Sequence, residues 1–396
     1  MENNESYTEI TTKSWGTRIA DSIKSVLLGV ILFLASFVVL WWNEGRAVRT
    51  SEGLEEGLSQ VISVNPDAIN EANDGKLIHI SGIIITQDTL RDNEFNIKAN
   101  ALKLKREVEM YQWVEEEKET KEKQIGGSEK TTTTYEYLKK WVDIVVNSDD
   151  FKVKEGHSNP SGFPYSPYTI SASEAKLGAF ILSGDLISQI NEFTPYPINN
   201  FDSQSYRNAR MVNEGNGNHG NGIIQKIYIG KGEPANPEIG DVKVSFKTVN
   251  SGNRYSIIAK QIKNTFEPFT TKSGISIQMV SPGVVSAEQM FSSAQKGNTI
   301  TTWILRLIGF LMMFGGISLI FKPLVVLADV LPFLGNLLNL GLSLFSGVVS
   351  FGLSLITIAI AWIFYRPALG ITLLVIAIIT AAYLIVKGSK GKTNKS

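Results

Sequence analysis

The residues best placed to do chemistry in this chain are two charged side chains that follow a run of apolar ones. Glu44 and Arg46 stand in the sequence WWNEGRAV, directly after a charge-free segment at 25–42. Two interpretations remain open: the pair snorkels and caps the apolar segment at a membrane surface, or it contacts lipid head groups or a partner protein. Other candidates for such contacts are Asn43, Arg306 and Arg366.

The histidines and the other carboxylates form no recognisable site in the sequence. His79 lies in an apolar run and fits a packed core histidine, and His157 precedes a proline- and aromatic-rich loop typical of a structural turn. The carboxylates of 115–122 are interleaved with lysines, as on a solvated surface. Metal sites need converging ligands, and no nucleotide-binding, zinc-protease or nucleophile-elbow motif occurs. We therefore expect no catalytic residue, no metal site and no cofactor.

Composition narrows the class further. The chain has no cysteine, which excludes disulfides, thiol nucleophiles and zinc–thiolate sites. Lys+Arg and Asp+Glu balance at 38 each over 396 residues. The polar stretch 44–299 is mildly acidic, with 28 basic and 33 acidic residues. This charge does not favour nucleic acid as a partner.

The elements that must position these residues are apolar segments at both ends of the chain. A membrane-spanning helix needs about 20 apolar residues, which predicts four transmembrane helices over the ranges 23–43, 300–321, 340–365 and 368–386. No small-residue cleavage site follows the first segment, so we interpret it as an uncleaved anchor and not a signal peptide.

The segment 323–339 is harder to assign. Lys322, Asp329 and Asn336 recur at seven-residue spacing, which would place them on one stripe of a helix, and Pro332 would bend it. We interpret the segment as interfacial or re-entrant. A fifth span is the alternative.

The loops indicate an orientation. An N-terminal leader, 1–22, carries Lys13 and Arg18, and the C-terminal tail, 388–396, is basic. The positive-inside rule then predicts that both termini are cytosolic. The domain over 44–299 would face the lumen or the periplasm.

That middle domain has the pattern of an α+β unit in which strands dominate. In 241–249, for example, Val242, Val244 and Phe246 alternate with Lys243 and Ser245. Further strands are predicted at 76–86, 102–117, 131–145, 226–229, 255–262 and 275–280, and helices at 174–192 and 286–296. We also expect the first apolar helix to continue through 43–59.

Small residues recur at three- and four-residue spacing in the third predicted span. This face consists of Ser343, Ser346, Gly347, Ser350 and Ser354. Small faces let helices approach closely. Packing within the bundle and a homo-oligomer interface both fit the pattern.

Several long and unusual segments resemble one known family, the LUMA or transmembrane protein 43 family. In the family's order they are NEGRAVRT…EGLS at 43–59, REVEMYQWVE at 106–115, GHSNPS at 156–161, GDVKVSF at 240–246, PFTTKSG at 268–274, SAEQMF at 286–291 and AWIFYRP at 361–367. The resemblance implies four spans with a large lumenal domain, in the endoplasmic reticulum and inner nuclear membrane of eukaryotes. It implies no catalytic residues. Prokaryotic relatives would lie in the cell membrane.

The resemblance also implies a function. Members of the family act as scaffolds that organise membrane protein complexes, with emerin and lamins as eukaryotic partners, and they self-associate. We therefore expect a non-enzymatic, homo-oligomeric membrane scaffold. The alternatives are a membrane-bound enzyme acting on lipid, in which Glu44, Arg46 and His157 would converge on one pocket, and an oligomeric transporter or channel.

Overall fold

Three long helices dominate the structure, a computed structural model that describes residues 5–198, 201, 206, 208–215, 224–367 and 371–372. They are α1 (Trp15–Gln60), α3 (Ala287–Ala328) and α4 (Pro332–Tyr365). All three are long and apolar enough to cross a membrane, by length and composition. They contain the first three predicted spans. The fourth, 368–386, and the basic tail lie outside the described residues, apart from 371–372.

The helices α1 and α3 pack side by side and antiparallel, and small residues allow their close approach. A Cβ atom added at Gly29 would lie 2.8 Å from the carbonyl oxygen of Gly316, and one added at Gly316 would lie 2.7 Å from the amide nitrogen of Phe33. Such contacts leave no room for a side chain, so the sequence fixes this crossing point through two glycines.

The predicted small-residue face of α4 packs inside the chain. Ser346 and Ser350 have no exposed surface, and the Ser354 hydroxyl donates to Sδ of Met313 in α3 at 3.7 Å. Ser343 and Gly347 are half-buried. Packing within the bundle therefore accounts for this face, which is not free to form an interface between copies in this arrangement.

Most of the remaining chain forms two sheets. The eight-stranded, antiparallel sheet has the order β1-β7-β6-β14-β13-β12, with β11 beside β14 and β8 beside β6. Its strands are β1 (Glu5–Lys13), β6 (Ala101–Lys123), β7 (Glu129–Val142), β8 (Tyr168–Ser171), β11 (Thr194–Pro195), β12 (Ala209–Glu214), β13 (Ile224–Ile229) and β14 (Val242–Asn250).

The seven-stranded sheet has the order β10-β9-β3-β15-β16, with β19 beside β15 and β2 beside β3. Its strands are β2 (Ile62–Ser63), β3 (Leu77–Ile85), β9 (Lys176–Leu177), β10 (Phe180–Ile181), β15 (Arg254–Ile262), β16 (Thr265–Glu267) and β19 (Met279–Pro282). The smaller elements are β4 (Leu90–Asp92), β5 (Ile97–Ala99), β17 (Phe269–Thr270), β18 (Ser276–Ile277) and α2 (Gly184–Gln189).

Strand β14 shows how far the predicted alternation holds. Val242, Val244 and Phe246 are buried in the core as expected. Lys243 on the opposite face is also buried, because its ammonium lies 4.0 Å from the centre of the Trp141 ring and pairs with Glu214. Both faces of the strand are therefore covered.

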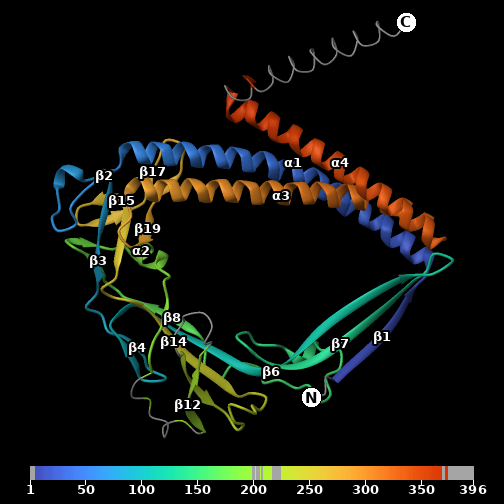
Figure 1. Ribbon diagram of the computed structural model, residues 1–396, viewed down its shortest axis with the longest axis horizontal. Helices are drawn as coiled ribbons and strands as arrows, with labels where there is room; N and C mark the ends of the chain where they lie inside the picture. The colour runs from blue at the N-terminus through green and yellow to red at the C-terminus, as the bar shows by residue number, and fades with distance from the viewer. Residues whose placement is uncertain are drawn as a thin grey trace.

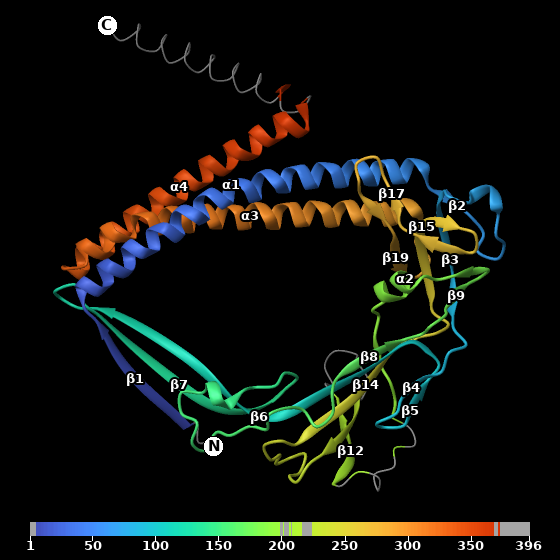
Figure 2. The ribbon, with the colours of Figure 1, turned by 180° about the vertical axis from the view of Figure 1, so that it is seen from behind.

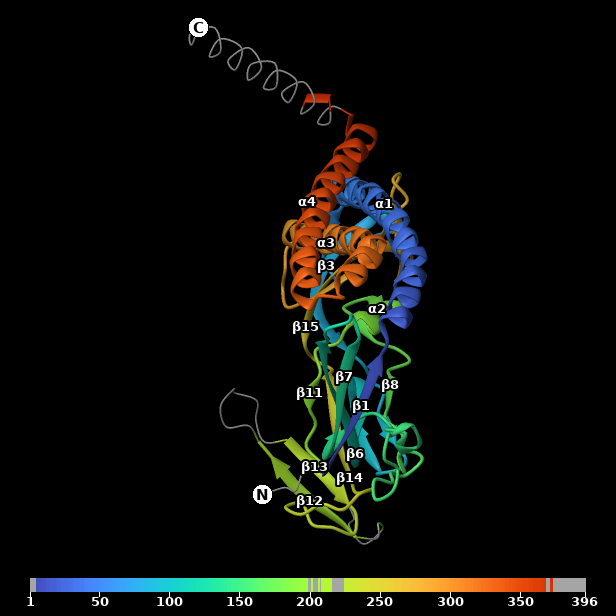
Figure 3. The same ribbon diagram turned by 90° about the vertical axis from the view of Figure 1, so that its right-hand side faces the viewer.

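Together these parts form a frame-like shape (Figure 1). The helices α1 and α3 make one long side, the sheet containing β3 and β15 makes one end, and the eight-stranded sheet makes the opposite side. From that sheet a ribbon of β6, β7 and β1 returns to the far end of the helices, and the view from behind shows the same junction (Figure 2). We call residues 5–13 and 115–137 the arm. Seen end-on, the helices lie above the strand-rich part in a narrow molecule (Figure 3).

The leader predicted at 1–22 is not a separate unit. Residues 5–13 form β1, which pairs with β7 from Glu5 opposite Tyr137 to Lys13 opposite Glu129. Ser14 then caps α1 by accepting a hydrogen bond from the Thr17 amide. The pairing joins the leader and the middle domain in one sheet. The side of the membrane on which the termini lie stays a prediction from the sequence.

The segment 323–339 is not a separate element: it contains the end of α3, a turn and the start of α4. α3 continues through Pro323 to Ala328, and α4 begins at Pro332, close to the first helical position, where the missing N–H of proline costs least. Asp329 lies in the turn between them and is fully buried.

The helix predicted at 174–192 is mostly absent. Only 184–189 is helical, as α2, while 176–177 and 180–181 form the short strands β9 and β10. Leu177 and Phe180 are fully buried against β3, so pairing and burial at the sheet edge outweigh the local helical pattern.

Candidate functional site

Charged side chains gather at both ends of the apolar helical bundle. At the end nearer the seven-stranded sheet, the Glu44 carboxylate accepts hydrogen bonds from Nε and Nη2 of Arg306 at 2.7 and 2.8 Å. It also accepts one from Nε1 of Trp362 at 2.7 Å. Glu44 is only 2% exposed, so this is a buried bidentate ion pair that joins α1, α3 and α4.

Arg46 extends the same group of contacts. Its guanidinium donates to Oδ1 of Asn298 at 3.0 Å, to Oγ1 of Thr302 at 3.0 Å and to Oδ1 of Asn43 at 3.3 Å. Asn43 is fully buried and donates to the carbonyl of Thr302 at 3.1 Å. We call Asn43, Glu44, Arg46, Arg306 and Trp362 the near cluster.

The structure brings the predicted contact residues together, although in an unexpected role. Glu44 and Arg306 lie 262 positions apart in the sequence and neutralise each other, instead of reaching separately to a membrane surface. Arg366 lines a cavity of about 200 Å³ beside them, which Trp303 also lines. The Arg306 guanidinium lies 4.7 Å from the centre of the Trp303 ring.

A second cluster lies at the far end of the bundle, and the sequence analysis missed most of it. Arg18 donates to Oδ2 of Asp329 at 2.6 Å and to the carbonyl of Gly127 at 2.5 Å, and it lies 3.3 Å from Glu129. Lys123 donates to Oδ1 of Asp329 at 2.8 Å. The side chains of Arg18 and Asp329 are 8% and 1% exposed, so this is again a buried ion pair. We call Arg18, Lys123, Glu129 and Asp329 the corner cluster.

Backbone contacts reinforce the corner cluster. The Trp15 indole donates to the carbonyl of Val326 at 2.9 Å, and the Gly126 amide donates to the carbonyl of Val330 at 3.0 Å. Gly127 has φ +81°, and a Cβ atom there would lie 2.3 Å from the Trp15 ring. Only glycine fits this close approach with a positive φ.

One sequence signal did point to the corner cluster. Of the three polar residues at seven-residue spacing, Asp329 and Asn336 both accept hydrogen bonds from Lys123, the second at 3.1 Å. The predicted stripe on one helix is wrong, because the helix is interrupted between Ala328 and Pro332, but two of its three residues do meet at Lys123. The spacing could not identify the arm as the partner, because Lys123 is 206 positions away from Asp329.

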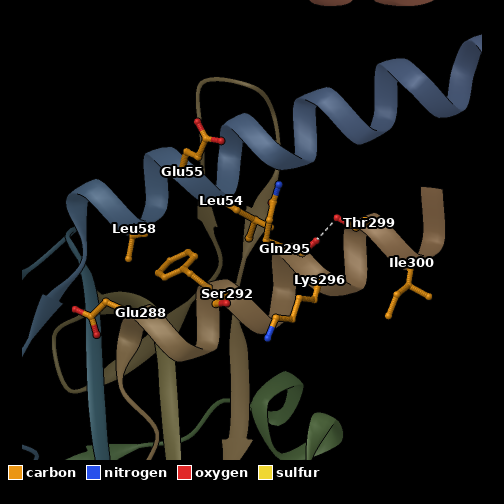
Figure 4. A pocket seen from close by; sticks show the side chains of 10 residues that line it. Leu54, Glu55, Leu58, Glu288, Ser292, Gln295, Lys296, Thr299 and Ile300 are labelled. Carbon is orange, nitrogen blue, oxygen red and sulfur yellow. Dashed lines mark hydrogen bonds between the residues drawn. The ribbon is translucent and has the colours of Figure 1, made fainter. Parts of the chain in front are cut away.

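A groove of about 540 Å³ runs between α1 and α3 beyond the near cluster (Figure 4). Leu54, Leu58 and Phe291 line it with apolar side chains, and the exposed residues Glu288 and Lys296 also line it. The carboxylates of Glu55 and Glu288 and the ammonium of Lys296 are spread along the groove and do not converge on one point (Figure 4).

The two described histidines have structural partners. His79 is 8% exposed, with Nδ1 3.1 Å from the Ser63 hydroxyl and Nε2 2.9 Å from the Val285 carbonyl. His157 stacks on the Tyr137 ring at 3.9 Å between centres, with Nε2 3.1 Å from a Glu5 carboxylate oxygen.

The environment of His157 belongs to the arm. Tyr137 donates a hydrogen bond to Glu115. Burial, and to a lesser degree this hydrogen bond, raises the pKa of Tyr137 to about 12. These residues pack on β6 and β7, whereas Glu44 and Arg46 pack between helices. The convergent pocket required by the lipid-enzyme alternative is therefore not formed. Among the described residues, no group of three His, Asp or Glu side chains could hold a metal ion.

Comparisons with known proteins agree on one family. A family model described as Transmembrane protein 43 matches residues 110–367. Transmembrane protein 43 from Rattus norvegicus is 34% identical over 362 residues, which cover 88% of this chain and 86% of the relative. The protein of the same name from Homo sapiens is 33% identical over the same coverage. The Transmembrane protein 43 homolog of Drosophila melanogaster is 31% identical over 88% of this chain and 90% of its own length. No solved structure matches.

Proposed function

The chain belongs to the transmembrane protein 43 family and is an integral membrane protein, and from this premise we propose that it is a non-enzymatic scaffold that organises membrane protein complexes. The observation that supports the proposal most is the double attachment of the strand-rich part to the apolar bundle. One attachment is the continuation of α1 and α3 into the seven-stranded sheet. The other is the corner cluster at the tip of the arm.

A second observation concerns how the buried charges are used. In both clusters the carboxylates bind cationic side chains of the same chain. Groups that neutralise one another in this way stabilise a geometry and are poorly placed to transfer protons to a substrate. This favours a binding platform over an enzyme.

The compartment and the partners are part of the same proposal. In a eukaryotic cell the scaffold would lie in the endoplasmic reticulum and inner nuclear membrane, with emerin- and lamin-type partners. In a prokaryotic cell it would lie in the cell membrane with other partners. Self-association would use surfaces other than the small-residue face of α4, because that face is buried within the chain. The fourth span, 368–386, remains a prediction from the sequence.

Crosslinking in native membranes tests the scaffold role. The tagged protein is crosslinked, solubilised and purified, and its partners are identified by mass spectrometry. We expect a reproducible set of membrane proteins and higher oligomers. A strictly monomeric protein without partners would overturn the proposal.

Two variants sharpen this experiment. Asp329→Asn weakens the attachment of the arm and should reduce the recovered partners several-fold if partner binding depends on the shape of the frame. Asp21→Asn removes a carboxylate of the same helical region that is 45% exposed and should leave the partner set unchanged. Equal loss in both variants would contradict the dependence on shape.

A further inference from the structure

The charges at the end of the bundle that holds the near cluster do not balance. Three guanidiniums, those of Arg46, Arg306 and Arg366, gather there around one carboxylate, that of Glu44. Arg306 neutralises Glu44 in the bidentate ion pair. Arg46 donates to the oxygens of neutral side chains, and in the part of the chain that the structure describes neither Arg46 nor Arg366 forms an ion pair. Three cations and one anion leave two positive charges.

The neighbouring helical residues do not compensate this excess. In α1 the next charged residue after Arg46 is Arg49, and in α3 the nearest one before Arg306 is Lys296. Both are cations. α4 contains no charged residue at all. The excess of positive charge is therefore a property of this end of the bundle.

The cavity of about 200 Å³ beside the near cluster gives these charges a place to act. It lies between the helices, and Arg306 and Arg366 line it from α3 and from the end of α4. A water molecule occupies about 30 Å³ in the liquid, so the cavity admits a group as large as a phosphate. Guanidinium N–H groups match phosphate oxygens in geometry as well as in charge.

The cavity lies where the head groups of a bilayer are expected. Glu44 is the second residue after the charge-free segment 25–42. Trp42 and Trp303, which are 53% and 64% exposed, lie at the same end, and exposed tryptophans favour the boundary between acyl chains and water. Leu307, next to Arg306, is 56% exposed and offers an apolar surface beside the cavity. A phosphate that enters here can therefore keep its acyl chains in the bilayer.

We infer that this cavity binds the phosphate of an anionic phospholipid, from the leaflet at the near-cluster end of the bundle. Glu44 occupies Nε and Nη2 of Arg306, so Arg366 supplies most of the donors to the phosphate. A zwitterionic head group carries its own cation and gains less from the two positive charges. The lipid would complete the charge balance of the site. The inference does not depend on the scaffold role.

Lipid competition measured by native mass spectrometry tests the inference. The full-length protein in mild detergent is mixed with equal amounts of phosphatidylglycerol and phosphatidylcholine that have the same acyl chains. We expect the protein to retain phosphatidylglycerol preferentially. Arg366→Gln should reduce this preference about fivefold, the effect of one cation beside an anionic lipid. Equal retention of the two lipids by the unaltered protein would overturn the inference.

Arg49→Gln is the matched control. Arg49 is an exposed cation of α1 that does not line the cavity, so the variant removes the same charge from a nearby place. The preference for phosphatidylglycerol should stay unchanged. If Arg49→Gln and Arg366→Gln lose the preference equally, the total charge of the protein attracts the lipid and the cavity does not.

A third variant separates lipid binding from the stability of the bundle. Glu44→Gln removes the carboxylate from the cavity wall, so it should keep or increase the preference although it weakens the helix contacts. A loss in both Glu44→Gln and Arg366→Gln would mean that the intact bundle is needed and not the positive charge, which contradicts the inference.

Inorganic phosphate distinguishes a lipid from a soluble anion. Because the acyl chains hold the lipid beside the cavity, an excess of inorganic phosphate should displace little phosphatidylglycerol. Complete displacement, at an ionic strength matched with chloride, would show that the cavity binds a free phosphate and would overturn its assignment to a lipid.

Discussion

The two charged clusters are chemically alike but are built from different parts of the chain. The near cluster uses residues of α1, α3 and α4 only, so helix packing brings it together. The corner cluster joins the start of α1, the arm and the α3–α4 corner, so it forms only after long-range strand pairing. The near cluster therefore holds the bundle together, whereas the corner cluster fastens the bundle to a distant domain. No residue of the corner cluster belongs to the core of either sheet.

The largest effect should come from Asp329→Asn. This variant weakens the attachment of the arm to the bundle and leaves the near cluster, which holds the helices together, unchanged. It leaves the buried Arg18 and the nearby Lys123 facing a neutral amide, and we expect the free energy of unfolding to fall by about 3 kcal/mol. Thermal or denaturant unfolding in mild detergent measures the loss, and protease digestion should release the leader much faster. Asp21→Asn should change either result little. A stable variant with a protected leader would mean that the corner cluster does not hold the arm on the helical bundle.

Glu44→Gln should have the next largest effect, at the other end. The amide oxygen can still accept from Nη2 of Arg306 and from Trp362, but the amide NH2 then faces Nε of Arg306, which is also a donor. The side chain also no longer neutralises the guanidinium, so we expect a loss of about 2 kcal/mol. The leader should stay protected from protease, in contrast to Asp329→Asn. Glu52→Gln, on the exposed face of α1, is the control. Faster release of the leader in Glu44→Gln would show that the two ends are not independent.

Gly316→Ala tests the helix contact that both ends share. Its new Cβ atom would lie 2.7 Å from the backbone of Phe33, which can move only with the whole helix, so we expect a loss of about 1–2 kcal/mol. The neighbouring Gly315 has open space, and Gly315→Ala should be neutral or slightly stabilising. Unfolding of both variants in detergent gives the comparison. Equal effects would contradict the close approach of α1 and α3.

Lys123→Gln should have the smallest effect. Lys123 is 25% exposed and is the second of the two cations on Asp329, so we expect a loss of about 1 kcal/mol and a modest rise in leader proteolysis. Lys121→Gln, on the same strand with a side chain that is 58% exposed, serves as the control and should have no measurable effect. A Lys121 effect as large as that of Lys123 would point to the net charge of the arm instead of the contact.

Elements with a periodic pattern could be predicted from the sequence. β14 carries apolar residues with the period of a strand, β3 and β15 are short runs rich in isoleucine, and the expected continuation of the first helix through 43–59 matches the end of α1 at Gln60. β1 has no such signal, because almost all of it is exposed and its stability comes from pairing with β7. Pairing between residues more than a hundred positions apart leaves no local trace.

The same distinction applies to the candidate site. Glu44 stood out because it directly follows an apolar segment, and Arg306 because it lies inside a predicted span, where charges are rare. This led to the near cluster. Arg18 stood out only as a positive charge before a span, and Lys123 only as one charge in a solvated run. Both residues become partners of the buried Asp329 because the arm folds back onto the bundle. Topology predicted from hydropathy alone includes no such contact.

The arm also bears on the curvature of the bundle. β6 has 23 residues, about 75 Å of extended chain, and it is paired along its length with β14 and then with β7. A hydrogen-bonded ribbon of this kind hardly stretches, and it is fixed at one end in the sheet and at the other to the corner. It therefore holds the α3–α4 corner at a set distance from the eight-stranded sheet, on the side towards which α1 bends (Figure 2). A fixed distance of this kind limits how far α1 and α3 can straighten.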